Sequence, residues 1–123
     1  MNKYLIDTNI IIYHLNGESV ATEWLLSRQD NLAISIITKI EVLSYPFEQE
    51  EETLVLKFLN QFELIHISDE IIDATIRLRR LRKIKTPDAI IAATALVHGL
   101  CVCTRNIGDF KNLDVKYVDP FVP

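Results

Sequence analysis

Short apolar runs alternate with longer amphipathic segments along this chain, and this alternation predicts its secondary structure. The runs are short enough to be strands, whereas the segments between them place apolar residues at helical spacing. We expect strands over residues 3–6, 32–35, 62–67, 100–103 and 115–118, and helices over 9–15, 19–29, 38–45, 48–60, 68–83 and 86–97. Strands that alternate with helices predict a mainly parallel central sheet covered on both faces, which is a three-layer α/β/α fold.

The segment after Lys85 is the most apolar of the expected helices. Thr86 is a favourable N-cap residue and Pro87 is preferred at the first helical position, so this helix is expected to start there. Its residues from Ala89 to Val97 are apolar almost all the way round, which indicates a buried helix. An earlier helix, 38–45, is expected to stop before Pro46 because proline disfavours helical geometry in the residue before it.

Length and composition predict a single globular domain over residues 1–123. The chain is 49% hydrophobic and 24% charged with 3 glycines and 4 prolines, which excludes a disordered or repetitive protein. We expect no signal peptide, and no apolar stretch reaches the length of a membrane span. Cys101 and Cys103 stand two residues apart in an expected strand, a poor arrangement for a disulfide. Reduced thiols and a cytoplasmic location follow.

The net charge of −4 argues against broad electrostatic binding of nucleic acid, but two local clusters stand out. The acidic cluster lies where a helix is expected to begin, and there it complements the helix dipole. The basic cluster fits equally the solvated end of a helix and a surface that holds phosphates. The acidic cluster is Glu48, Glu50, Glu51 and Glu52, and the basic cluster is Arg77, Arg79, Arg80, Arg82, Lys83 and Lys85.

Asp7 lies at the junction between the first expected strand and the first expected helix. Asp, Thr and Asn side chains commonly cap helices, so Asp7 can be interpreted as a capping residue. A carboxylate at the carboxyl end of a strand also points into the crevice where parallel α/β sheets bind ligands. The two roles are compatible, since one turn can both start a helix and aim the carboxylate.

Three further acidic residues are placed to meet Asp7. Glu41 lies within the helix after the second strand, Asp88 in the first turn of the buried helix, and Asp109 in the loop after the fourth strand. Strand ends and helix starts of a parallel sheet meet at one edge, so the topology permits the four carboxylates to converge. Each has a plainer interpretation: a surface residue for Glu41, a helix N-terminus for Asp88 and turn chemistry for Asp109.

Converging carboxylates require a cation. Two carboxylates about 5 Å apart repel by roughly 3 kcal/mol at an effective dielectric of about 20, so their pKa values rise unless positive charge neutralises them. Oxygen ligands select hard ions, which predicts Mg²⁺ or Mn²⁺ with water and substrate phosphate completing the site. Zinc is not indicated, because His14, His66 and His98 are isolated and no Cys or His pair has zinc spacing. The sequence also lacks a Gly-rich phosphate loop and any spacing that argues for Ser-His-Asp or Cys-His catalysis.

Four segments together resemble the successive motifs of PIN-domain ribonucleases, in order and at the family's spacing. They are Leu5–Asn9 (LIDTN), Ile37–Glu41 (ITKIE), Pro87–Ala95 (PDAIIAATA) and Thr104–Phe110 (TRNIGDF). Within that family the chain is similar to the VapC toxins of bacterial and archaeal toxin–antitoxin pairs, over its whole length. The resemblance implies a small α/β/α nuclease that cuts single-stranded or loop RNA with Mg²⁺ or Mn²⁺.

The resemblance also implies roles for the acids. Asp7, Glu41 and Asp88 correspond to the family's central acidic trio. Many PIN domains have an acid where this chain has Asn106, whereas VapC-like sequences often combine that Asn with an acid three residues on, here Asp109. Asp109 is therefore expected to complete the site, with Asn106 assisting.

Neighbouring residues are expected to support this site. Thr8 and Thr104 are placed like the family's hydroxyls that hydrogen-bond the acids or the metal-bound water. Candidates for binding RNA phosphates beside the site are Arg77, Arg80, Arg82, Lys83, Lys85 and Arg105.

The resulting hypothesis is a metal-dependent endoribonuclease toxin, homodimeric and silenced by a cognate antitoxin, with Trp24, Phe58 and Phe62 as apolar surface for partners. An aspartate-nucleophile phosphohydrolase would need a second Asp two residues after Asp7, where Asn9 stands. The remaining alternative is a non-catalytic RNA- or protein-binding regulatory module on the same fold, in which the acids only cap helices.

Overall fold

The computed structural model describes residues 3–122, and strands alternate with helices along it as expected. The strands are β1 (Tyr4–Ile6), β2 (Leu32–Ser35), β3 (Glu63–Ile65), β4 (Cys101–Cys103) and β5 (Tyr117–Val118). The α-helices are α1 (Thr8–Leu15), α2 (Ser19–Leu26), α3 (Ile36–Leu43), α4 (Gln49–Leu59), α5 (Asp69–Leu81) and α6 (Thr86–His98). Two 3₁₀ turns, η1 (Gln29–Asn31) and η2 (Ile107–Asp109), lie in the connections.

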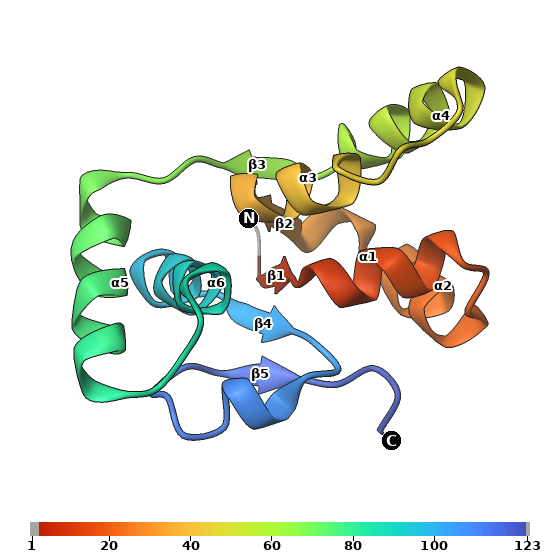
Figure 1. Ribbon diagram of the computed structural model, residues 1–123. Coiled ribbons are helices and arrows are strands. Elements are labelled where there is room, and N and C mark those ends of the chain that lie inside the picture. Colours follow the sequence, from red (N-terminus) through yellow and green to blue (C-terminus); the bar gives the residue numbers. More distant parts are fainter. Residues whose placement is uncertain (1–2, 123) are drawn as a thin grey trace.

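The five strands form one parallel sheet in the order β3-β2-β1-β4-β5, which runs from the top to the bottom of Figure 1. Strand β1 is central, and its residue Ile6 pairs with Cys103 of β4. The next residues, Asp7 and Thr104, therefore leave the carboxyl edge of the sheet side by side. The backbone N–H of Asp7 continues the ladder by donating to the carbonyl of Cys103 at 2.9 Å.

Helices cover both faces of the sheet, which confirms the predicted three-layer architecture. Successive strand residues point into separate cores: Leu5 and Val102 face α5 and α6, whereas Ile6 and Cys103 face the other helices. The first core includes Ile71 and Ala74 of α5 and Ile91, Ala92, Ala93 and Ala95 of α6, and the second includes Ile10, Ile11, Ala21, Leu25, Val42, Val55 and Leu59 of α1 to α4. Helix α6 is buried along most of its length, as its apolar sequence predicted.

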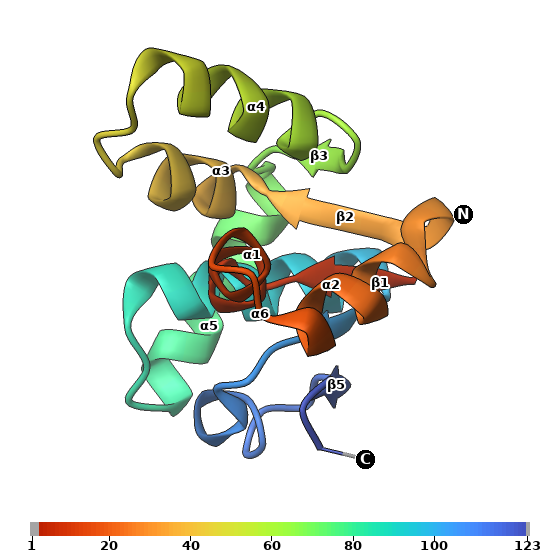
Figure 2. The ribbon, with the colours of Figure 1, turned by 90° about the vertical axis from the view of Figure 1, so that its right-hand side faces the viewer.

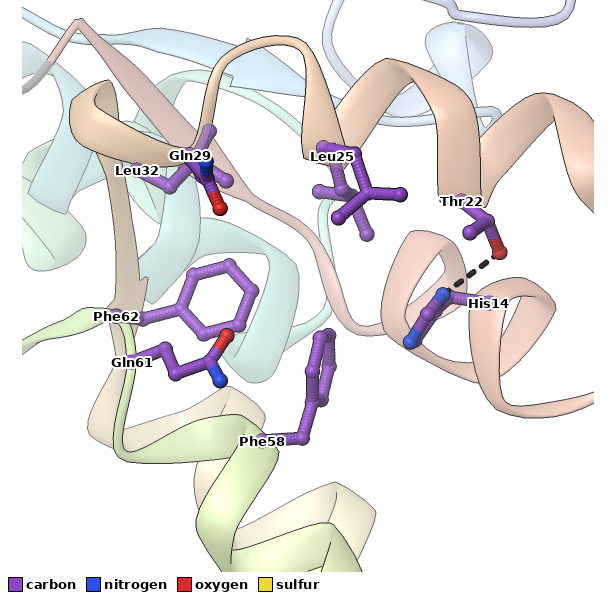
Figure 3. Close-up of a pocket in the computed structure, with 9 residues that line it drawn as sticks. His14, Thr22, Leu25, Gln29, Leu32, Phe58, Gln61 and Phe62 are labelled. Carbon is purple, nitrogen blue, oxygen red and sulfur yellow. Dashed lines mark hydrogen bonds between the residues drawn. The ribbon is translucent and has the colours of Figure 1, made fainter.

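Helix α4 lies at the periphery of the fold, above α3 in Figure 2. A small cavity of about 40 Å³ lies where its end meets α1 and α2, and Figure 3 shows Phe58 and His14 side by side in its lining. The imidazole of His14 is stacked on Phe58 with ring centroids 4.4 Å apart, and its Nδ1 atom is hydrogen-bonded to the hydroxyl of Thr22 at 2.7 Å. Burial lowers the pKa of His14 below its ordinary value.

Of the three aromatic residues expected to form partner surface, Phe62 is packed within the core, so the prediction was wrong for it, whereas for Trp24 and Phe58 it stays a prediction. Phe62 is buried, and Phe58 is half-buried against it. Trp24 is half-buried, with its ring edge-on to Tyr4 at 4.9 Å and the guanidinium of Arg28 at 4.3 Å from its centroid.

Several helix ends differ from the predictions by a few residues. Helix α3 begins at Ile36 rather than Thr38, because the hydroxyl of Ser35 caps it by accepting a bond from the N–H of Ile37 at 3.1 Å. The cap of α6 is Lys85, so Thr86 is its first helical residue rather than its cap. The segment expected as one helix over 19–29 stops at Leu26 and continues as the turn η1.

Both cysteines are free thiols, as expected, with Cys103 buried and Cys101 half-buried. Among the described residues, no helix is both long and apolar enough to cross a membrane.

Candidate active site

Asp7 is buried at the junction of β1 and α1, where it serves as the N-cap of the helix. Its side chain is only 5% exposed. The Oδ1 atom accepts the backbone N–H of Thr8 at 2.8 Å, and the Oδ2 atom accepts the hydroxyl of Thr104 at 2.8 Å. Burial raises the pKa of Asp7, the two hydrogen bonds oppose that rise, and repulsion from Glu41 and Asp109 adds to it.

Thr104 connects three backbone segments around Asp7. Its hydroxyl accepts the side-chain amide of Asn9 at 3.2 Å and the backbone N–H of Asn106 at 2.9 Å while it donates to Asp7. Asn9 in turn accepts the backbone N–H of Arg105 at 3.3 Å through its Oδ1 atom. Sequence reasoning assigned no role to Asn9, although its place two residues after Asp7 was the available signal.

Glu41 reaches the same edge from α3. The hydroxyl of Thr8 donates to its Oε1 atom at 2.6 Å, and that hydroxyl also lies 3.1 Å from the hydroxyl of Thr38. Since Thr8 has one hydroxyl proton and gives it to Glu41, the fully buried Thr38 is the donor to Thr8. Thr38 was missed in the sequence, where its position one turn before Glu41 on α3 pointed to it.

Asp88 and Asp109 meet across the start of α6. Both carboxyl groups line the same pocket beside the first turn of this helix. Burial, and after it repulsion from Asp109, Asp7 and Glu41, raises the pKa of Asp88 to about 6. The side-chain amide of Asn106 donates to the Oδ2 atom of Asp109 at 2.6 Å. Asn106 therefore holds Asp109 at this edge.

The four carboxylates share one electrostatic site, because the charges of Asp7, Glu41 and Asp109 each act on Asp88. Within residues 3–122, however, no group of three or more His, Cys, Asp or Glu side chains is arranged to hold a metal ion as it stands. The carboxylates of Glu41 and Asp109 are instead hydrogen-bonded to neighbouring side chains. As a donor set they fit a hard divalent cation, since all are carboxylate oxygens, and a cation would neutralise the repulsion that raises the pKa of Asp88.

The basic cluster borders this edge only in part. A pocket of about 480 Å³ beside Asp88 and Asp109 is lined by Arg79, Lys83 and Lys85. Arg82 lines a neighbouring pocket that also contains Asp109, and its Nε atom donates to the carbonyl of Asn112 at 3.3 Å. Arg77 and Arg80 are exposed on α5 and line neither of these two pockets. Arg79 was not among the sequence candidates, although it belongs to the same basic cluster.

Arg105 lies on the other side of the edge, directly after Thr104. Its guanidinium stacks on two aromatic rings, 4.2 Å from the centroid of Phe121 and 5.1 Å from that of Tyr13. The side chain is exposed. The C-terminal segment thus contacts the first helix of the fold at the candidate site.

A groove of about 640 Å³ runs from Glu41 along α1, α3 and α4. Its apolar lining consists of Ile12, Leu15, Val42, Tyr45, Pro46, Phe47 and Val55. Glu41 and Glu51 also line it, so the groove combines an apolar lining with negative charge.

The fold and site define an α/β protein with a cluster of carboxylates at the carboxyl edge of a parallel sheet. Comparisons with known proteins identify the family to which it belongs. A family model of the PIN domain matches residues 4–116. Ribonuclease VapC1 of Methanocaldococcus jannaschii is 30% identical, and the alignment covers 91% of this chain and 82% of that protein. Ribonuclease VapC10 of Mycobacterium tuberculosis is 34% identical over 86% of this chain and 84% of its own length.

A solved structure is similar over the full fold. The structure described as a toxin-antitoxin complex from Klebsiella pneumoniae matches with a TM-score of 0.86 and 37% identity, covering 97% of this chain and 98% of that one. The chain therefore belongs to the PIN-domain family, within its VapC ribonucleases. PIN-domain VapC proteins are metal-dependent nucleases, so the chain is a ribonuclease of that type.

Proposed function

We propose that Asp7, Glu41, Asp88 and Asp109 together bind Mg²⁺ or Mn²⁺ and that this site hydrolyses phosphodiester bonds within RNA, in a toxin controlled by an antitoxin. The observation that carries the proposal is the meeting of four carboxylates at one edge of the sheet. Asp7 is buried there, Glu41 is bonded to the neighbouring Thr8, and Asp88 and Asp109 line one pocket. Carboxylates that lie close together at the edge of a sheet repel each other, which destabilises the charged forms unless a cation neutralises them. Holding such a cation is the function that makes this arrangement useful.

Different residues of the chain orient the carboxylates and accept the proton of the attacking water. Thr104 and the Thr8 backbone hold the Asp7 carboxylate in one orientation, and the Thr8 hydroxyl does the same for Glu41. When bound, a divalent cation supplies Lewis-acid chemistry at a phosphodiester and cancels the repulsion among the acids. The attacking water gives its proton to a carboxylate of the Asp88–Asp109 pair, which lies at the open side of the site.

The substrate is RNA, held through its phosphates. Lys83, Lys85 and Arg79 line the pocket that contains Asp88 and Asp109, so a phosphate beside these acids has positive charge within reach. Because the net charge of the chain is −4, such local cations are needed for a polyanion to approach the acidic edge.

The antitoxin binds in the groove along α1, α3 and α4. Two features support this: the lining is mainly apolar, and Glu41 and Glu51 add negative charge to it. An amphipathic helix with a basic residue fits both features, and on binding it covers Glu41. The toxin–antitoxin complex from Klebsiella pneumoniae is consistent with such a partner.

Residues 1–123 act as a single domain in this proposal. The free thiols of Cys101 and Cys103 agree with a cytoplasmic protein. The homodimer expected from the sequence stays a prediction, and sedimentation of the purified protein tests it.

Cleavage of labelled single-stranded RNA by the purified protein tests the proposed reaction. The wild type is expected to cleave with Mg²⁺ or Mn²⁺ and to stop when EDTA is added. Asp7→Asn is expected to stay folded, because Asn also caps helices, and to lose cleavage together with Mn²⁺ binding. Asp114→Asn, which changes an exposed carboxylate in the segment before β5, is the matched control and should cleave normally.

Full cleavage by Asp88→Asn, or wild-type cleavage that EDTA does not affect, would overturn the four-carboxylate site. Mapping RNA ends after brief expression in cells identifies the substrate class by its cut sites. Unchanged RNA and normal growth would favour the regulatory binding module instead.

A further inference from the structure

The side chain of Arg105 is held in place at both ends. Its backbone N–H donates to Asn9 at 3.3 Å, and Asn9 is bonded to Thr104, so the network that holds Asp7 also fixes the start of this side chain. Its guanidinium lies 4.2 Å from the ring centroid of Phe121 and 5.1 Å from that of Tyr13. Both distances are within the range of favourable cation–π contacts.

The C-terminal segment is folded into a turn that brings Phe121 to this position. After β5 the carboxylate of Asp119 accepts the backbone N–H of Phe121 at 2.9 Å, and its carbonyl accepts the N–H of Val122 at 3.2 Å. The ring of Phe121 then packs against Tyr13 of α1, with centroids 5.2 Å apart and the ring planes at 60°. The tail therefore contributes one wall of the Arg105 support.

Arg28 also lies against aromatic rings, but its N–H groups are engaged in hydrogen bonds within the protein. Arg28 lies 4.3 Å from the centroid of Trp24 and 5.9 Å from that of Tyr4, at the amino edge of the sheet. Its guanidinium donates to the hydroxyl of Ser27 at 2.8 Å and to the carbonyl of Trp24 at 3.5 Å. Among the described residues the guanidinium of Arg105 has no such hydrogen bond, and its side chain is exposed.

We propose that Arg105, supported by Tyr13 and Phe121, binds a backbone phosphate of the RNA beside the acidic edge, and that the C-terminal turn positions it. Stacking occupies the flat face of a guanidinium and leaves its N–H edge for a phosphate. The support restricts the guanidinium beforehand, so less conformational entropy is lost when the phosphate binds. The inference rests on the proposed ribonuclease function. It adds a second phosphate contact for the RNA, on the side of the site opposite Lys83 and Lys85.

Binding of a fluorescein-labelled oligouridylate, followed by anisotropy over a series of salt concentrations in EDTA, tests this contact. The Asp7→Asn protein serves as background so that the RNA stays intact. Losing one phosphate contact lowers the slope of log Kd against log salt by about 0.7 for a single strand. Arg105→Gln in that background is expected to show this change and weaker binding, whereas Arg28→Gln, the matched control, should leave the slope and affinity unchanged.

Variants of the support test the role of the C-terminal turn. Phe121→Ala keeps the charge of Arg105 but removes one wall, so we expect several-fold weaker binding with the slope retained. Phe121→Leu fills part of the space and should recover part of the affinity, which separates the support from a general loss of folding. Circular dichroism confirms that each variant is folded.

Three results would overturn the inference. They are an unchanged slope in Arg105→Gln, an equal fall of the slope in Arg28→Gln, and full affinity in Phe121→Ala. Salt-dependent binding by the background protein together with an unchanged Arg105→Gln slope overturns only the role of Arg105. Absence of salt-dependent RNA binding by the background protein overturns the ribonuclease function and this inference with it.

Discussion

The hydroxyl of Thr104 donates a 2.8 Å hydrogen bond to the Oδ2 atom of Asp7, joining the ends of strands β4 and β1. Both side chains are buried, with Asp7 only 5% exposed. A buried carboxylate needs such donors to stay ionised, and here the bond opposes the rise in the pKa of Asp7 that burial causes. Thr104 thereby links the folding of the sheet to the charge state of the candidate site.

Replacing Thr104 by Val removes the donor with little change of shape. We expect the free energy of unfolding to fall by about 1–3 kcal/mol, because a buried acceptor on Asp7 loses its partner. Urea denaturation at neutral pH measures the change. Thr104→Ser, which keeps the hydroxyl, should lose clearly less stability than Thr104→Val, and equal losses would show that packing matters more than the bond.

Asp88 makes the metal-free protein less stable as the pH rises. Its pKa is raised to about 6 in the folded chain from an ordinary 3.8, so the folded state binds more protons than the unfolded state between these values. The stability that Asp88 contributes is fully present below pH 3.8 and is lost as the pH rises through about 6. Asp88→Asn is therefore expected to raise the midpoint of urea unfolding at neutral pH in EDTA.

The same substitution should flatten the dependence of stability on pH in that interval relative to the wild type. Asp114→Asn, which replaces an exposed carboxylate, is the control and should change neither quantity. A lower unfolding midpoint for Asp88→Asn at neutral pH would contradict the repulsion among the acids.

Adding Mn²⁺ is expected to raise the melting temperature of the wild-type protein, and EDTA should reverse the change. A ligand that binds only the folded state stabilises it in proportion to the logarithm of its concentration over Kd. Differential scanning fluorimetry over a Mn²⁺ titration measures this without RNA. Asp7→Asn should show a much smaller rise, and an equal rise in both proteins would place the ion elsewhere.

His14 has the opposite linkage to Asp88. Its folded pKa lies below the ordinary value of 6.5, so its contribution to stability is lost as the pH falls through this region. The charged imidazole would lie in the cavity lined by Phe58, Leu25 and Phe62, which carries no counter-charge among its lining residues. We expect His14→Gln to reduce the loss of stability on acidification, measured by urea unfolding across pH 7.5 to 5.5 in the wild type and the variant.

The exposed His66 offers the matched control for this measurement. His66→Gln should follow the wild-type pH dependence, and a His14→Gln curve parallel to the wild type would show that protonation of His14 does not contribute to the loss of stability on acidification.

Phe110 anchors the loop that carries Asn106 and Asp109. Its side chain is fully buried and packs in the same core as Ile91 and Val102. Phe110→Ala is expected to lower the free energy of unfolding by about 3–5 kcal/mol, since it leaves a cavity in that core. Phe110→Leu should cost less, and both values come from urea denaturation.

The alternation of apolar runs and amphipathic segments was enough to predict the parallel three-layer fold, because strand and helix periods are local properties of the chain. The buried character of α6 followed from its composition for the same reason. The ends of α3 and α6 were less predictable, since capping depends on single side chains such as Ser35. Whether Trp24, Phe58 and Phe62 face outward depended on packing partners that lie far apart in the sequence.

For the site, the sequence by itself determined which acids leave strand ends and helix starts, namely Asp7, Asp88 and Asp109. Only the tertiary structure decided how the acids are held: by Thr104 directly after β4, by Thr8 bridging to Glu41, and by Asn106 bonded to Asp109. It also decided that Phe121 reaches Arg105. These hydrogen bonds and ring contacts join residues 16 to 97 positions apart, and local periodicity does not encode the distances between them. The order of strands and helices depends on local periodicity alone, so the sequence could predict it.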